Sequence, residues 1–186
     1  MRGDERVDSL VLGLHLTALA LALAPPILFA AVIAPAVFGV LPTKDLAGAV
    51  QSPILSGICV MAEISFAVLF ATAWWLTRKD APRTGRALLT RLPVLGFFAA
   101  LVIRQLLIPP IDRIREEAPG LIDSLPAADP SKILLDRYHR LATGFFALDI
   151  AAAFLVLLAT ARLLAARRAA PPEPARTKDV VKVLDL

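Results

Sequence analysis

The sequence predicts an all-α, polytopic membrane protein, folded as a bundle of four transmembrane helices. Four long apolar stretches carry this prediction, because about 20 apolar residues of helix cross a hydrocarbon core about 30 Å thick. The first contains no Asp, Glu, Lys or Arg, and each of the others contains a single such residue in its interior. The stretches are residues 10–43, 46–77, 92–111 and 141–161.

Composition supports the same class. Hydrophobic residues make up 58% of the 186 residues and the mean hydropathy is +0.70, whereas soluble domains are roughly half apolar. The net charge is +4, but the basic residues flank the apolar stretches and form no patch, which argues against a nucleic-acid partner. The single cysteine, Cys59, excludes an intramolecular disulfide and a thiolate zinc cluster.

The first span is expected at about residues 10–40. Pro25, Pro26 and Pro35 lie within it, and each removes a backbone donor and favours a kink. The stretch is far longer than the 7–15 apolar residues of a signal peptide. We therefore expect it to be retained as the first helix.

The second and third spans are expected at about residues 53–77 and 92–110. Trp74 and Trp75 end the second span, where amphipathic indoles favour the head-group level. A basic loop follows, and a Pro-Pro pair is expected to end the third span.

The fourth span is expected at about residues 138–164, after the longest loop of the chain. The beginning of that loop is expected to form a short helix with its charged side chains on solvated faces. Residues 1–166 then form the transmembrane domain, and residues 167–186 form a disordered cytoplasmic tail rich in proline and charge. The charged residues of the short helix are Asp112, Arg113, Arg115, Glu116 and Glu117.

Orientation follows from the basic residues. The N-terminus, the second loop and the tail together contain thirteen Lys and Arg residues, against six in the other two loops. Because cytoplasmic loops carry the excess of Lys and Arg, both termini are expected to be cytoplasmic (N-in/C-in) in the inner membrane. The long third loop would face the periplasm or the exterior.

Glu63, Arg104 and Asp149 are the ionisable residues inside the apolar stretches. A charge at the centre of a bilayer costs about 2.5–3.5 kcal/mol on insertion scales, so such residues usually face the bundle interior and pair. At 1.5 Å per residue all three lie in the same half of the bilayer. Arg104 could fork onto one carboxylate and leave the other to hold a proton or cation. The alternative is an ion-pair cluster that only fixes helix register.

The two histidines are expected far apart. His15 lies near the cytoplasmic end of the first span and His139 near the outer start of the fourth, which argues against joint ligation of one metal or haem. Each is either a single axial ligand or a polar group hydrogen-bonded at an interface. The sequence has no Ser-His-Asp order, P-loop, dinucleotide fingerprint, HExxH or CxxC. An enzyme is therefore the less favoured class.

Two segments resemble a known family. Residues 32–50, VIAPAVFGVLPTKDLAGAV, and residues 134–150, LLDRYHRLATGFFALDI, are similar to the end of the first span and the start of the last helix in the domain-of-unknown-function 4149 family, which comprises transmembrane protein 205-like integral membrane proteins. The matching residues are Ala34, Pro35, Phe38, Ala47, Gly48, Tyr138 and His139.

The resemblance implies four spans and no established biochemical activity. The family is also distantly similar to copper-resistance membrane proteins and to a haem-binding protoporphyrinogen oxidase, which makes His139 the first residue to test for haem or copper. Asp149 stands where the family usually has an amide, and His15 has no counterpart there.

Three function classes stay open at this point. The leading one is a protein that binds or translocates a small ligand, proton or ion, with Glu63, Arg104 and Asp149 as its polar core and His139 at the outer mouth. The second is a haem- or copper-binding redox protein. The third is an accessory subunit of a membrane complex. Membrane lipid is the expected partner, with a homo-oligomer or a membrane complex as further options.

Overall fold

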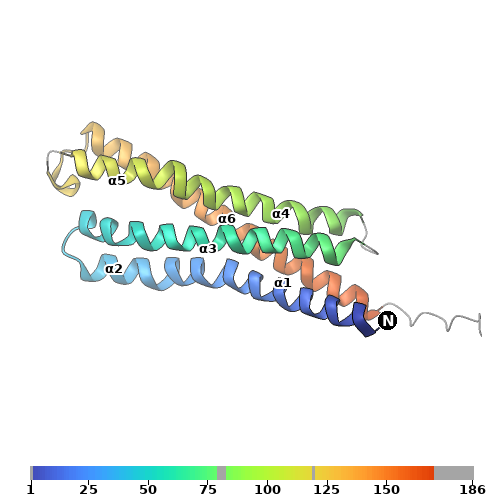
Figure 1. The fold of residues 1–186 in the computed structure, drawn as a ribbon. Coiled ribbons are helices and arrows are strands. Elements are labelled where there is room, and N and C mark those ends of the chain that lie inside the picture. Colours follow the sequence, from blue (N-terminus) through green and yellow to red (C-terminus); the bar gives the residue numbers. More distant parts are fainter. Residues whose placement is uncertain (1, 79–82, 119, 170–186) are drawn as a thin grey trace, which may run out of the picture.

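Four long helical rods make up the protein in the computed structural model (Figure 1), which describes residues 2–78, 83–118 and 120–169. The described residues contain helices and connections but no strand. Each rod is long and apolar enough to cross a membrane, as the four apolar stretches predict. The four candidate spans are Arg6–Val40, Lys44–Thr77, Gly85–Glu117 and Pro130–Ala166.

The first rod contains Pro25 and Pro26 inside its first α-helix, and it stays helical past Pro35 because the helix widens just before that residue. In this π-helical turn the Ala34 N–H bonds to the Phe29 carbonyl, five residues back. Pro35 then lies in the first turn of the next helix, where a missing N–H costs little. The elements of the rod are α1 (Arg2–Leu28), the π-helix η1 (Phe29–Ile33) and α2 (Ala34–Val40).

The third rod also contains a π-helical turn before its prolines, and one prediction for this rod is wrong. The helix does not end at Pro109 and Pro110, because both lie in the first turn after a π-helix and the helix continues to Glu117. The elements are α4 (Arg83–Val102), the π-helix η2 (Ile103–Leu107) and α5 (Ile108–Glu117). Residues 79–82 of the preceding basic loop lie outside the described residues.

The other two rods begin earlier than predicted. Helix α3 (Lys44–Thr77) starts where the Thr43 hydroxyl accepts a hydrogen bond from the Leu46 N–H at 3.2 Å, a typical N-cap. Helix α6 (Pro130–Ala169) extends three residues into the predicted tail. The rest of that tail, residues 170–186, lies outside the described residues.

The connection between α5 and α6 folds onto the start of α3. It contains a short 3-10 helix, η3 (Ile122–Ser124). The Asp123 carboxylate accepts a hydrogen bond from the Lys44 backbone N–H at 2.7 Å, and Lys132 donates to the Asp123 carbonyl at 3.3 Å. This contact joins the two connections at one end of the bundle, here named the loop end. Both ends of the described chain lie at the opposite, terminal end (Figure 1).

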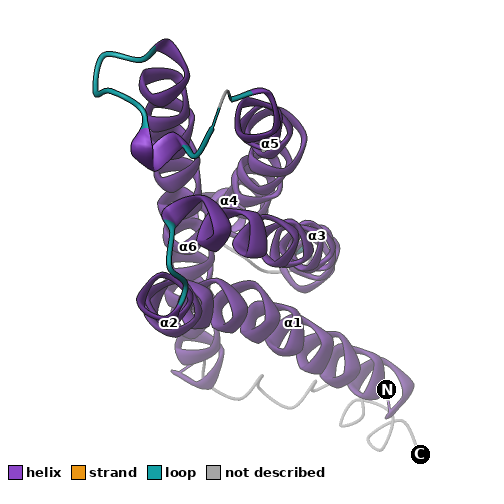
Figure 2. Cartoon of the chain, turned by 90° about the vertical axis from the view of Figure 1, so that its left-hand side faces the viewer, coloured by secondary structure: helices purple, strands orange, loops and turns teal. Residues whose placement is uncertain are grey.

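The interior of the bundle holds many small residues beside large apolar ones such as Phe66 and Leu69, and its exterior is apolar. Helix α3 packs between α1 and α4, and α6 closes the bundle against both (Figure 2). Large apolar side chains point outward, such as Leu10 (74% exposed) and Ile64 (62% exposed). Small interior and large exterior side chains are typical of helices packed in lipid. The fully buried small residues include Ala22, Ala62, Ala73, Ala100, Ala152 and Ala153.

Candidate functional site

His15 on α1 is bonded at both ring nitrogens. Its Nδ1 lies 2.8 Å from Thr72 Oγ1 on α3, and its Nε2 lies 3.0 Å from Thr160 Oγ1 on α6. The Thr72 hydroxyl is 2.7 Å from the Val68 carbonyl, to which it gives its only hydrogen. We therefore assign the hydrogen of the ring to Nδ1, which donates to Thr72, while Nε2 accepts from Thr160.

This geometry confirms the prediction of a hydrogen-bonded polar group at His15 and corrects only its location. The residue is 1% exposed and inside the bundle, not at an interface, and neither nitrogen is left for a metal. It links three helices. Twenty-one residues of α6, about 32 Å of helix, separate its partner Thr160 from His139, which agrees with the predicted separation of the two histidines.

Glu63 and Arg104 form a bidentate ion pair between α3 and η2. The Arg104 Nε lies 2.7 Å from Glu63 Oε1, and Nη2 lies 2.8 Å from Oε2. The guanidinium also donates to the Gln105 side-chain oxygen at 2.9 and 3.1 Å, in the amide orientation that pairs donors with acceptors. Arg104 therefore makes the predicted bidentate contact, and its partner is the carboxylate of Glu63.

Asp149 on α6 stands apart from this ion pair. Its side chain is 2% exposed, and within the described parts of the chain no group donates a hydrogen bond to Oδ1. Cys59, one turn before Glu63 on α3, lies close enough to Asp149, Glu63 and Arg104 to interact electrostatically with all three. The predicted polar core therefore consists of a closed ion pair and a separate carboxyl group in one neighbourhood.

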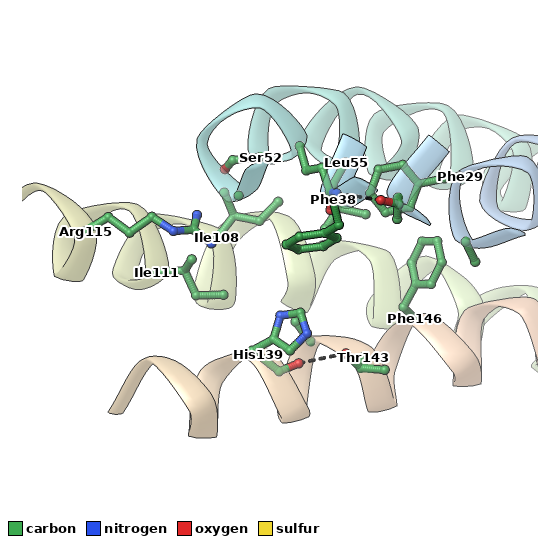
Figure 3. A pocket seen from close by; sticks show the side chains of 15 residues that line it. Phe29, Phe38, Ser52, Leu55, Ile108, Ile111, Arg115, His139, Thr143 and Phe146 are labelled. Carbon is green, nitrogen blue, oxygen red and sulfur yellow. Dashed lines mark hydrogen bonds between the residues drawn. The ribbon is translucent and has the colours of Figure 1, made fainter. Parts of the chain in front are cut away.

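A pocket of about 290 Å³ opens at the loop end (Figure 3). Residues from the first rod, α3, α5 and α6 line it. Its polar side chains come from Gln51, Ser52, Arg115, His139 and Thr143, and its apolar and small ones from Phe29, Ala30, Ala34, Phe38, Gly48, Leu55, Ile108, Ile111, Ala142 and Phe146.

The pocket is polar at its outer part and apolar at its inner part. On α5 the lining passes from Arg115 to Ile108, and on α6 from His139 to Phe146. Each interval is seven residues, about 10 Å of helix. Figure 3 shows the Arg115 side chain extending toward Ile108 and the His139 ring pointing toward Phe38, with Phe29 and Phe146 at the far end. The two rings pack edge to face with centroids 5.8 Å apart.

Arg115 is the cation of this pocket. Its side chain is 20% exposed, and its buried Nε has no hydrogen-bond partner among the described residues. Nη1 lies 3.4 Å from Asp112 Oδ1, and that carboxylate also accepts from Ser52 at 2.7 Å. A Cβ on the buried Gly48 would collide with the guanidinium. The glycine therefore allows Arg115 to lie directly against α3.

The sequence prediction that placed Arg115 on a solvated face is wrong. Ile108, Ile111 and Arg115 follow the three- and four-residue spacing of one helix face, and that face points into the bundle. If this spacing had been followed across Pro109 and Pro110, the sequence would have identified the residues of α5 that line the pocket. They were missed because the span was assumed to end at these two prolines.

Four residues of the resemblance motifs meet in this pocket although they come from distant segments: Ala34, Phe38, Gly48 and His139. The His139 ring has no hydrogen-bond partner in the described structure; only its backbone carbonyl is engaged, by Thr143 at 2.9 Å. Comparisons with family models, with curated proteins and with solved structures found no match to this chain. The family assignment therefore stays a prediction.

The His15 brace predicts a measurable loss of stability in Thr160→Val. The substitution leaves Nε2 buried without a partner, which costs about 1–3 kcal/mol. Chemical unfolding in mixed micelles measures this loss as a lower free energy of unfolding. Thr17→Val is the matched control, because the exposed Thr17 hydroxyl donates only to the Gly13 carbonyl of its own helix. Equal stability of the two variants would contradict the brace.

The ion pair predicts strong coupling between Glu63 and Arg104. Glu63→Gln or Arg104→Gln alone leaves the remaining charge without its partner and should clearly lower the unfolding midpoint. The double variant should recover most of that loss, since no lone charge remains. The same unfolding assay, arranged as a double-mutant cycle, gives the coupling energy. Additive losses would show that the two side chains do not pair.

Proposed function

We propose that the chain is a multi-pass inner-membrane protein with cytoplasmic termini, and that it binds a small amphipathic anion in the loop-end pocket. Its outward-facing apolar side chains support membrane residence. In each rod, at most 39% of the most apolar 18-residue segment is buried inside the bundle. The excess of Lys and Arg at the terminal end supports the orientation.

One observation carries the proposal for the ligand: the half-buried Arg115, whose Nε has no hydrogen-bond partner among the described residues, lines a pocket whose other end is aromatic. A carboxylate or phosphate accepts charge-assisted hydrogen bonds from Arg115. The His139 imidazole lies at the same end and offers a second polar contact. The alkyl or aromatic part of the ligand would pack against Phe29 and Phe146.

The size of the pocket limits the ligand. At about 290 Å³ it lies at the small end of ligand pockets, which span roughly 300–1,000 Å³. The polar and apolar ends are about 10 Å apart along the helices. A short-chain amphiphile fits these dimensions, and a long-chain lipid would leave most of its tail outside.

The ion pair has a positioning role in this proposal. Arg104 lies in η2, which runs directly into α5, the helix that carries Arg115. By tying η2 to Glu63 on α3, the pair sets the register of α5 against α3. Gly48 on α3 meets Arg115 at that register. A ligand at the loop end is a different site from the one that the sequence suggests for a ligand, proton or ion among Glu63, Arg104 and Asp149.

Radiolabelled decanoate tests the proposal with the protein in lipid nanodiscs and empty nanodiscs as the blank. We expect saturable binding that Arg115→Gln weakens by about 10- to 100-fold, the value of a hydrogen bond to a charged group. Arg113→Gln, an exposed cation two residues away on α5, should bind as the parent protein does. Decanol, with the same chain and no charge, should compete poorly.

Two further arms complete this experiment. Short-chain phosphatidic acid added to the nanodiscs should compete with decanoate if a lipid phosphate is the natural head group, and leave binding unchanged if a free carboxylate is. Gly48→Ala, which displaces the guanidinium, should weaken binding without removing a charge. Non-saturable binding, or equal binding by Arg115→Gln and Arg113→Gln, would overturn the proposal.

Haem is the second candidate, because the His139 ring is unengaged; a porphyrin is larger than the pocket of about 290 Å³ and would project beyond it, so haem fits less well than a short amphiphile. One imidazole can serve as a proximal ligand, and Arg115 could meet a propionate. Copper fits less well, since the described residues contain no group of three metal-ligating side chains. A Soret band in purified protein that disappears in His139→Ala would favour haem; the amphiphile proposal expects colourless protein.

A further inference from the structure

A second site of different chemistry lies at Asp149, deeper in the bundle. The side chain is 2% exposed and belongs to the face of α6 that also carries the fully buried Ala152, Ala153 and Val156. Oδ1 receives no hydrogen bond from any described group. Asp149 does not line the loop-end pocket, so its role is independent of the amphiphile proposal.

No cation is available to Asp149 from the helices around it. Arg104 of η2 is the one Lys or Arg within the four apolar stretches, and Glu63 of α3 already occupies it in two short hydrogen bonds. Cys59 of α3 is uncharged as a thiol. His15 of α1 is held by two threonines. An ionised Asp149 would thus be an unpaired anion among apolar helices, which is costly.

We propose that Asp149 is a proton-binding site, which the folded protein holds as a neutral carboxylic acid at neutral pH. A proton suits the site better than a metal cation does. Calcium takes six to eight oxygen ligands and magnesium an octahedral set, whereas the described residues place no cluster of three His, Cys, Asp or Glu side chains anywhere. A proton needs only the one carboxyl group.

Infrared spectroscopy of the protein in lipid tests this directly. At pH 7 we expect a carbonyl stretch of a protonated carboxyl group that shifts in heavy water and disappears in Asp149→Asn. Asp136→Asn, which removes a 73% exposed carboxylate from the same helix, is the matched control, because it should change only carboxylate bands. Loss of a carboxylate band, instead of a carbonyl band, in Asp149→Asn would overturn the proposal.

Carbodiimide labelling gives a second readout on the unmodified protein, should Asp149→Asn fail to fold. Dicyclohexylcarbodiimide adds the O–H of a protonated carboxyl group across one C=N bond, and the adduct rearranges to a stable N-acylurea without losing atoms. Ionised carboxylates lack the required proton. Peptide mass spectrometry should find the adduct on Asp149 and not on Glu63. An adduct on Glu63 alone, or none on Asp149, would contradict the proposal.

The folded state offers a third check. Because Asp149 is neutral in this account, Asp149→Asn should unfold at nearly the same denaturant concentration as the parent protein. A carboxylate that held the bundle together as a charged partner would give a clear downward shift of that midpoint instead, and would overturn the assignment.

Discussion

Polar groups buried between apolar helices must find their partners inside the protein, and this requirement shapes the whole bundle. Two sets of contacts meet it. His15 is shared between threonines of α3 and α6, and the Glu63 carboxylate takes the Arg104 fork. The first joins three rods and the second fixes the register of the third rod against α3. Apolar side chains, both small ones and large ones such as Phe66 and Leu69, fill the remaining interior, so the polar contacts help to decide which helix faces meet.

Two buried polar atoms among the described residues remain without a partner, Arg115 Nε and Asp149 Oδ1. Because buried polar groups need partners, Arg115 and Asp149 are the positions where we expect something outside the protein chain to bind. They differ in chemistry, because one is a fixed cation beside a pocket and the other is an acid that can become neutral by itself. An anionic ligand completes the first, and a proton completes the second. The two proposals concern different residues, so an experiment that disproves one leaves the other unaffected.

The number of rods could be predicted from the sequence because each apolar stretch is long enough to determine its own structure. The candidate ion pair could also be predicted, since a charged residue within such a stretch needs a partner. The choice of Glu63 over Asp149 could not, because it depends on how α3 and α6 are rotated about their axes. His15 was misplaced for the same reason: depth along a helix follows from counting residues, but the direction of a side chain does not.

Helix ends were the other source of error. Prolines usually end helices, yet here Pro25 and Pro26 lie inside α1, π-helical turns precede Pro35 and Pro109, and the rods continue. This continuation carries Arg115 into the bundle. The pocket itself joins residues from both ends of the chain, so only the packed structure could reveal it.

Single-cysteine labelling measures the central claim, four crossings with the loop end outside, most directly. In a Cys59→Ala background, Ser124→Cys should react with a membrane-impermeant maleimide in intact spheroplasts. Arg6→Cys should react only after the membrane is opened. Labelling of both positions from the same side, or protection of Ser124→Cys, would contradict the account.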